Sequence, residues 1–152
     1  MVRFSKKIEY ALGTLQFLGM NPNEFYSARE LSEILNIPYE FLSKTLAKLA
    51  KSKILNSNFG TKGGYQLSVN PKELKFSQIL SALDEPINVV ECVYGDEDIC
   101  ERSSICMIKT PMFQLQSKIN ELISSTTLED LLNFADKSTI QNSEQKVKQV
   151  LG

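Results

Sequence analysis

The sequence predicts a mainly α-helical fold with a small β-hairpin, organised as a winged helix-turn-helix domain followed by a long dimerisation helix. Three patterns predict it: a short helix and a basic-faced helix around a tight turn, a glycine-rich turn beside an alternating segment, and a late helix with a narrow apolar seam. The 152 residues suffice for one domain with its own core and an appendage. We divide the chain into a winged domain (1–86), a cysteine-bearing loop (87–108), late helices (109–135) and a flexible tail (136–152).

The first helix is predicted over residues 4–20, where apolar residues recur at steps of three and four along one face. Asn21 and Pro22 end it. A capping box, Ser27-x-x-Glu30, opens a short second helix that runs to about residue 35.

A break at residues 36–38 precedes a third helix, with Pro38 at its first position. The third helix has an apolar face and a basic face, formed by Leu42, Leu46 and Leu49 and by Lys44, Lys48 and Lys51. A short helix, a three-residue turn and a basic-faced helix form the outline of a helix-turn-helix.

A glycine-rich turn at residues 59–64 follows, and the next residues alternate between apolar and polar as in a half-buried strand. Alone, this segment predicts only a hairpin. Placed directly after a helix-turn-helix, it predicts a wing that contacts DNA, because the glycines allow positive φ and close approach of the backbone to a duplex.

The second half of the chain is expected to hold a short helix over 76–83, an aperiodic loop over 87–108 and a long helix opened by Thr110 and Pro111. The long helix carries a narrow apolar seam of Met112, Leu115, Ile119 and Leu122. Such a seam suits packing against the same helix of a second copy, with the chain's own core as the alternative. One more short helix is expected from 126 to about 134, and the polar residues 136–152 are expected to be frayed.

The chain contains no histidine, which excludes Ser-His-Asp and Cys-His hydrolases and HExxH metalloproteases. No nucleophile–base pair or phosphate-cradling loop is visible, so we expect neither an enzyme nor a small-molecule substrate. No signal peptide or membrane-spanning run is present, so we expect a cytoplasmic protein with reduced thiols.

The net charge of −1 conceals an asymmetry between the two halves of the chain. Residues 1–75 carry 11 basic and 6 acidic side chains, a net of +5, whereas residues 76–152 carry 6 and 12, a net of −6. The basic half is a candidate for contact with a polyanion, and scatter of surface charge is the alternative.

Double-stranded DNA is the polyanion that the motif favours. The first turns of the third helix would enter the major groove, and the wing would lie beside the backbone or in the minor groove. The candidate contacts are Arg29, Tyr39, Glu40, Ser43, Lys44, Lys48, Thr61 and Lys62. Lys48 lies one turn further along the third helix and is expected to meet phosphate, as is Arg29. Each lysine alone is consistent with an ordinary solvated side chain, but together they lie on elements of one motif. A two-fold dimer would double these contacts and read a pseudo-palindromic operator.

Three cysteines, Cys92, Cys100 and Cys106, lie within 15 residues, and neither gap is the C-x2-C of a zinc knuckle. Three thiolates with one further ligand suit an iron–sulfur cluster, because sulfur ligands select soft metals. Redox-active thiols and inert cysteines are the alternatives.

Four segments carry a resemblance to a known family: RFSKKIEYAL at 3–12, GTKGGYQL at 60–67, ILSALDEP at 79–86 and TLEDL at 127–131. Together they resemble the Rrf-two family of bacterial winged-helix transcription regulators, of the IscR, NsrR and RirA type. The resemblance covers roughly residues 1–135.

The resemblance implies a homodimeric winged-helix repressor or activator whose long helix forms the dimer interface, and of the two we expect a repressor. It also implies that Cys92, Cys100 and Cys106 hold a 2Fe-2S or 4Fe-4S cluster that sets DNA affinity and senses iron–sulfur status, nitric oxide or redox state. A cluster-free regulator that responds through cysteine oxidation or binds a protein partner is the alternative.

Two departures from the family pattern bear on these expectations. The first gap between cysteines has seven residues where the family commonly has five. Phe59 stands at a wing position that holds an arginine in some members, which leaves minor-groove contact to Lys62 or weakens it.

The fourth cluster ligand is a histidine in some members and, in others, an acidic residue in the first helix of the partner subunit. Because this chain has no histidine, the resemblance implies Glu9 at that position. The alternative role for Glu9 is a solvated first-turn glutamate that interacts favourably with the helix dipole.

Overall fold

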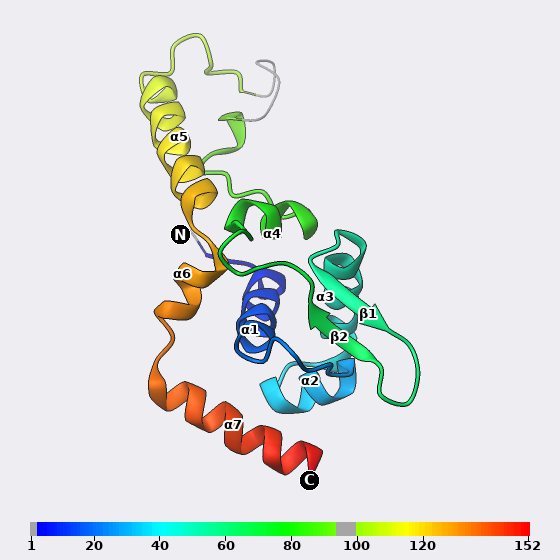
Figure 1. Cartoon of the computed structure of the whole chain (residues 1–152). Coiled ribbons are helices and arrows are strands. Elements are labelled where there is room, and N and C mark those ends of the chain that lie inside the picture. The colour runs from blue at the N-terminus through cyan, green and yellow to red at the C-terminus, as the bar shows by residue number, and fades with distance from the viewer. Residues whose placement is uncertain (1–2, 94–99) are drawn as a thin grey trace.

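The structure, a computed structural model, describes residues 3–93 and 100–152. In chain order its elements are α1 (Lys6–Met20), α2 (Ala28–Leu35), α3 (Tyr39–Lys51), β1 (Leu55–Asn58), β2 (Gly64–Leu67), α4 (Phe76–Ala82), the 3-10 helix η1 (Glu91–Val93), α5 (Lys109–Ser125), α6 (Leu128–Asn133) and α7 (Lys137–Leu151). Figure 1 shows α1–α4 and the hairpin gathered into one body, from which α5 projects. The predicted class, mainly α with a small β-hairpin, is confirmed.

The core is built around α1, which begins at the N-cap Ser5, whose hydroxyl accepts a hydrogen bond from the Ile8 N–H at 3.3 Å. α1 contacts α2, α3, β2 and α6. Of the apolar side chains buried in the described residues, all but Leu128 lie between residues 8 and 83. The core therefore belongs to the winged domain, and α6 joins it through Leu128.

The helix-turn-helix forms as the sequence predicts, through local signals. The Ser27 hydroxyl accepts from the Glu30 N–H at 3.2 Å, and the Glu30 carboxylate accepts from the Ser27 N–H at 2.7 Å, completing the capping box of α2. α2 ends at Asn36, which adopts a left-handed conformation with φ 53°. Pro38 is the N-cap of α3 rather than its first helical residue.

The wing is an antiparallel hairpin in which Leu55 pairs with Leu67 and Asn58 with Gly64. Its second strand is also attached to the segment before α2. The Tyr26 N–H donates to the Tyr65 carbonyl at 3.1 Å, and the Tyr65 N–H donates to the Tyr26 carbonyl at 2.7 Å. These two hydrogen bonds fix the hairpin relative to the helix-turn-helix.

The projecting helix α5 exposes part of its apolar seam. Leu115 is 41% exposed and Leu122 is 65% exposed, while Met112 and Ile119 are half-buried. α5 starts at Lys109, so Pro111 lies inside its first turn rather than at its first position.

The tail differs from the sequence prediction. Residues 136–152, expected to be frayed, form α7, which packs against α2. The reason is a sparse apolar stripe: Ile140, Val147 and Val150 are half-buried at helical spacing, and both valines pack against the core. The high polarity of the other positions is that of a solvated helix face.

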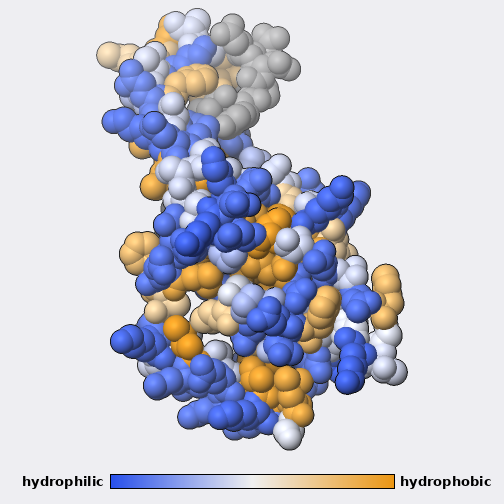
Figure 2. Space-filling model, in the orientation of Figure 1, coloured by the Kyte–Doolittle hydropathy of each residue, from blue (hydrophilic) through white to orange (hydrophobic). Residues whose placement is uncertain are grey.

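Figure 2 shows a predominantly hydrophilic surface on this side of the molecule, with apolar side chains in separate patches. Among the described residues, no helix combines the length and apolar character needed to cross a membrane.

Candidate nucleic-acid interface and cysteine segment

The N-terminal half of α3 presents the predicted major-groove contacts on its outer side. Tyr39 is 47% exposed, Glu40 and Lys44 are exposed, and Ser43 is half-buried. The Ser43 hydroxyl donates to the Glu40 carbonyl at 3.3 Å. The opposite face of α3 is anchored in the core by three fully buried leucines, Leu42, Leu46 and Leu49, so the outer side is held in a fixed orientation.

The wing tip and α2 supply the remaining exposed candidates. Thr61 and Lys62 are exposed at the hairpin tip, which projects beyond the helices in Figure 1, and Arg29 is exposed in the first turn of α2. The tip is closed by a hydrogen bond from the Gly63 N–H to the Gly60 carbonyl at 3.0 Å.

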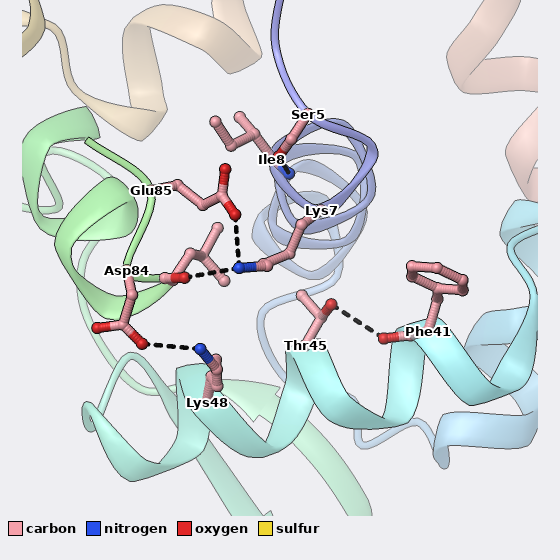
Figure 3. A network of polar contacts seen from close by, with 9 residues as sticks. Ser5, Lys7, Ile8, Phe41, Thr45, Lys48, Asp84 and Glu85 are labelled. Carbon is pink, nitrogen blue, oxygen red and sulfur yellow. Dashed lines mark hydrogen bonds and ion pairs between the residues drawn. The ribbon is translucent and has the colours of Figure 1, made fainter. Parts of the chain in front are cut away.

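Lys48 has a protein partner. Its ammonium lies 2.7 Å from the Asp84 carboxylate, beyond the end of α4 (Figure 3). Hydrogen bonding to Lys48, and then its charge, lower the pKa of Asp84. The lysine expected to meet phosphate therefore already has an anionic partner in this conformation.

Lys7 of α1 forms a similar ion pair with the residue after Asp84. The Lys7 ammonium lies 2.5 Å from the Glu85 carboxylate and donates to the Leu83 carbonyl at 3.0 Å (Figure 3). The hydrogen bond from Lys7 is the largest cause of a lowered pKa at Glu85. The residues that end α4 are thus joined to both α1 and α3.

The three cysteines lie between the winged domain and α5. Cys92 is in η1, Cys106 lies just before α5, and residues 94–99 of the predicted loop fall outside the described residues. All three thiols are free and half-buried. Within residues 3–93 and 100–152, no three Cys, Asp or Glu side chains converge into a metal site.

Glu9 is an exposed residue of α1. Its carboxylate lies 2.5 Å from the Lys6 ammonium, and hydrogen bonding to Glu9 raises the pKa of Lys6. In the described part of the chain, Glu9 does not join the cysteines of its own subunit in a ligand group.

Sequence reasoning missed Gln116, which is only 2% exposed. Its amide oxygen accepts from the Val89 N–H at 2.8 Å, and its amide nitrogen donates to the Ile87 carbonyl at 2.8 Å and to the Asn120 side-chain oxygen at 2.8 Å. Gln116 thereby attaches the segment before the first cysteine to α5. The one available signal was a glutamine directly beside the apolar seam.

Two exposed aromatic residues lie on the elements predicted to contact DNA, and sequence reasoning overlooked one of them, Phe41. Phe59 at the wing tip is 94% exposed, and Phe41 on α3 is 57% exposed. The Phe41 ring meets Tyr10 edge-on, with ring centroids 6.3 Å apart.

A buried-core helix-turn-helix with an attached hairpin wing and an exposed recognition face defines a winged-helix DNA-binding protein. The chain belongs to the Rrf2 (Rrf-two) family. The family model, described as an iron-dependent transcriptional regulator, matches residues 4–134.

Individual relatives agree with this membership. The HTH-type transcriptional regulator NsrR of Halalkalibacterium halodurans is 25% identical over 130 residues, covering 85% of this chain and 89% of that protein. The regulator IscR of Pectobacterium atrosepticum is 26% identical over 133 residues, covering 87% of this chain and 80% of that protein. The solved structure of CymR, the global cysteine regulator of B. subtilis, is similar in fold, with a TM-score of 0.70 at 23% identity over 90% of this chain and 100% of that one.

The predicted family is therefore confirmed, and the chain is a DNA-binding transcriptional regulator rather than an enzyme.

Proposed function

We propose that this protein is a homodimeric repressor whose affinity for DNA is set by an iron–sulfur cluster, and that it senses iron–sulfur status, nitric oxide or redox state. The observation that carries the proposal is the set of three free, half-buried cysteines on the segment that joins the winged domain to α5. The iron-dependent description of the family supports the same reading.

Cys92, Cys100 and Cys106 would hold the cluster, with Glu9 of the partner subunit as the fourth ligand. The donor set fits, because thiolates are soft ligands that suit iron–sulfur clusters. The described thiols do not form a three-ligand group by themselves, so metal binding would supply free energy for bringing the three thiolates together. A carboxylate is a harder and more labile ligand, which would leave the cluster open to exchange, nitric oxide or redox change.

The exposed seam on α5 supports the homodimer. Leu115, Leu122 and Phe113, the last 41% exposed, leave apolar surface on a projecting helix. Packing against the same helix of a second copy would bury this surface. The two-fold axis would set two α3 helices at the spacing of adjacent half-sites of a pseudo-palindromic operator.

In the DNA complex, Tyr39, Glu40, Ser43 and Lys44 would face the major groove, and Thr61 and Lys62 would lie at the minor groove or backbone. Arg29 and Lys48 would meet phosphates, Lys48 after separating from Asp84.

The deciding experiment is anaerobic purification and reconstitution with iron and sulfide, followed by visible absorption spectroscopy. We expect charge-transfer bands in the wild type and their loss when Cys92, Cys100 or Cys106 is replaced by serine. A colourless, iron-free protein would contradict the cluster.

Glu9→Ala tests the fourth ligand, with Glu33→Ala at an exposed position of α2 as its matched control. We expect Glu9→Ala to alter cluster decay or redox behaviour without unfolding the protein. Equal spectra and decay rates in both variants would remove Glu9 from the ligand set.

Binding to promoter DNA at several salt concentrations tests the regulator itself. We expect affinity that differs between the loaded and empty forms and weakens with salt. Absence of binding in both forms would contradict regulation through this interface.

A cluster-free, thiol-oxidation regulator is the second candidate, favoured by the three free thiols and by the lack of a preformed metal group among the described residues. It predicts an iron-free protein in which hydrogen peroxide changes DNA affinity. Mass spectrometry would then map the oxidised cysteine.

A further inference from the structure

Gln116 differs from every other residue of α5, since it is the only one of that helix's 17 described residues that is buried. Its amide binds both the N–H of Val89 and the carbonyl of Ile87, each at 2.8 Å. A buried amide with these partners holds the backbone in one position, because a shift would leave polar groups unpaired away from water.

The other end of the same segment is fixed to the winged domain. Asp84 ends α4 in the left-handed conformation, with φ 55°. The Glu85 N–H donates to the Leu80 carbonyl at 3.1 Å, and the Asp84 N–H donates to the Ser81 carbonyl at 3.2 Å. These two bonds form a Schellman ending, in which glycine is the usual left-handed residue. Unlike glycine, the aspartate at this position has a carboxylate, and this carboxylate forms the ion pair with Lys48 of α3 (Figure 3).

The connection between the two attachments is short. Val89 lies four positions after Glu85, so the stretch between them spans at most about 14 Å. A surface cleft of about 540 Å³, lined on one side by residues 84–88 and on another by Asn120, Ile123 and Ser124 of α5, leaves room beside it. The position of residues 86–88 therefore depends on the attachments at Glu85 and Val89. Cys92 follows three residues after Val89.

We infer that Gln116 is a positioning residue that couples α5 and the cysteine segment to the recognition helix, by holding residues 87–89 so that Asp84 keeps its ion pair with Lys48. The inference rests on the proposed function, in which a change at the cluster is what moves the cysteine segment. When the segment shifts, Asp84 withdraws from Lys48, whose ammonium becomes available to a DNA phosphate. Because Lys48 cannot serve both anions fully at once, the two equilibria are linked.

The primary test uses Gln116→Leu, which keeps a similar volume but removes the hydrogen bonds to Val89, Ile87 and Asn120, and the exposed Gln114→Leu on the same helix is its matched control. The readout is the pKa of the Asp84 carboxyl, measured by carbon-detected NMR on the full-length, cluster-free protein. We expect this pKa to rise toward its ordinary value in Gln116→Leu and to stay low in Gln114→Leu. If Gln116 had only a structural role, its replacement would lower the melting temperature without changing the pKa of Asp84.

A second variant, Gln116→Met, keeps an unbranched side chain of similar volume but removes the amide that binds Val89 and Ile87, so the inference can still be tested if Gln116→Leu does not fold. If either variant folds and the Asp84 pKa is unchanged, the coupling does not exist and the inference is overturned.

DNA affinity provides the functional readout, with duplexes recovered from a random library by the wild-type protein as the probe. We expect the ratio of dissociation constants between cluster-loaded and cluster-free forms to fall by at least about fivefold in Gln116→Leu. A wild-type ratio of one would contradict the proposed function, while the Asp84 pKa would still decide the inference. A wild-type-like ratio in a folded variant would overturn the inference alone.

Discussion

Replacing Gly64 by alanine should separate the wing from the helix-turn-helix. Gly64 opens β2 with φ +150°, in the region that favours glycine. A Cβ there would lie 2.4 Å from the carbonyl carbon and oxygen of Tyr26 and 2.7 Å from the Ser27 nitrogen. These atoms belong to the backbone, so they cannot move aside by a change of rotamer.

The expected destabilisation follows from two contributions. A side chain at positive φ costs about 1–2 kcal/mol. Relief of the overlap requires the Tyr26–Tyr65 bridge to open, and its two hydrogen bonds, at 3.1 and 2.7 Å, contribute about 1 kcal/mol each. The free energy of unfolding should therefore fall by about 3–4 kcal/mol, which corresponds to a melting temperature lower by roughly 10 °C.

Urea unfolding measures this change, and Gly13→Ala is the matched control. Gly13 lies inside α1 with no atom within 4 Å of an added Cβ, so alanine should stabilise the helix by up to about 1 kcal/mol. On DNA, Gly64→Ala should bind more weakly than wild type and Gly13→Ala should not. A loss of less than about 1 kcal/mol in Gly64→Ala would refute the packing argument.

Three further changes probe the dimer, the wing and the ion pairs. Leu122→Glu should shift the protein to monomer in light scattering, because it places a charge on the exposed seam, whereas Ser117→Glu on the opposite side of α5 should not; a persistent dimer would exclude the seam as the interface. Phe59→Arg should tighten DNA binding and steepen the dependence of log K on log salt by about one per subunit, and an unchanged slope would mean that the wing tip lies away from phosphate. The melting temperature should be nearly constant from about pH 5 to about pH 7.5, since the chain has no histidine. It should fall below about pH 4.5, because the pKa values of Asp84 and Glu85 are lowered on folding and their stabilisation is lost as the pH falls through them; a decline confined to higher pH would contradict this.

The winged domain could be predicted from sequence because its signals are local. The capping box of Ser27 and Glu30, the break at Pro38 and the glycines of the turn each act within a few residues. Hydrophobic periodicity then places the leucines of α3 in the core, and the lysines follow on the other faces.

The remaining features depend on partners distant in the chain. α7 was missed because its few apolar residues become significant only when α2 offers a surface to cover. Lys48 was assigned to phosphate because nothing near it in the sequence reveals Asp84, 36 residues later. Gln116 is polar in a helix with an apolar seam, and only the backbone of Ile87 and Val89, brought beside it by the fold, explains its burial.

The ion pair between Lys48 and Asp84 also predicts how the two DNA-binding states should differ in salt dependence. The pair of Lys48 and Asp84 carries no net charge, so the lysine contributes little to counterion release on binding DNA while Asp84 stays beside it. Once Asp84 withdraws, each subunit gains about one phosphate contact and a dimer gains about two. The slope of log K against log salt should therefore be steeper by nearly two in the state that frees Lys48, and Lys48→Met should remove this difference while leaving the contribution of Lys44 in place. Equal slopes in the loaded and empty forms would show that the recognition helix keeps the same charge in both, and the signal would then have to act through the spacing of the two half-sites alone.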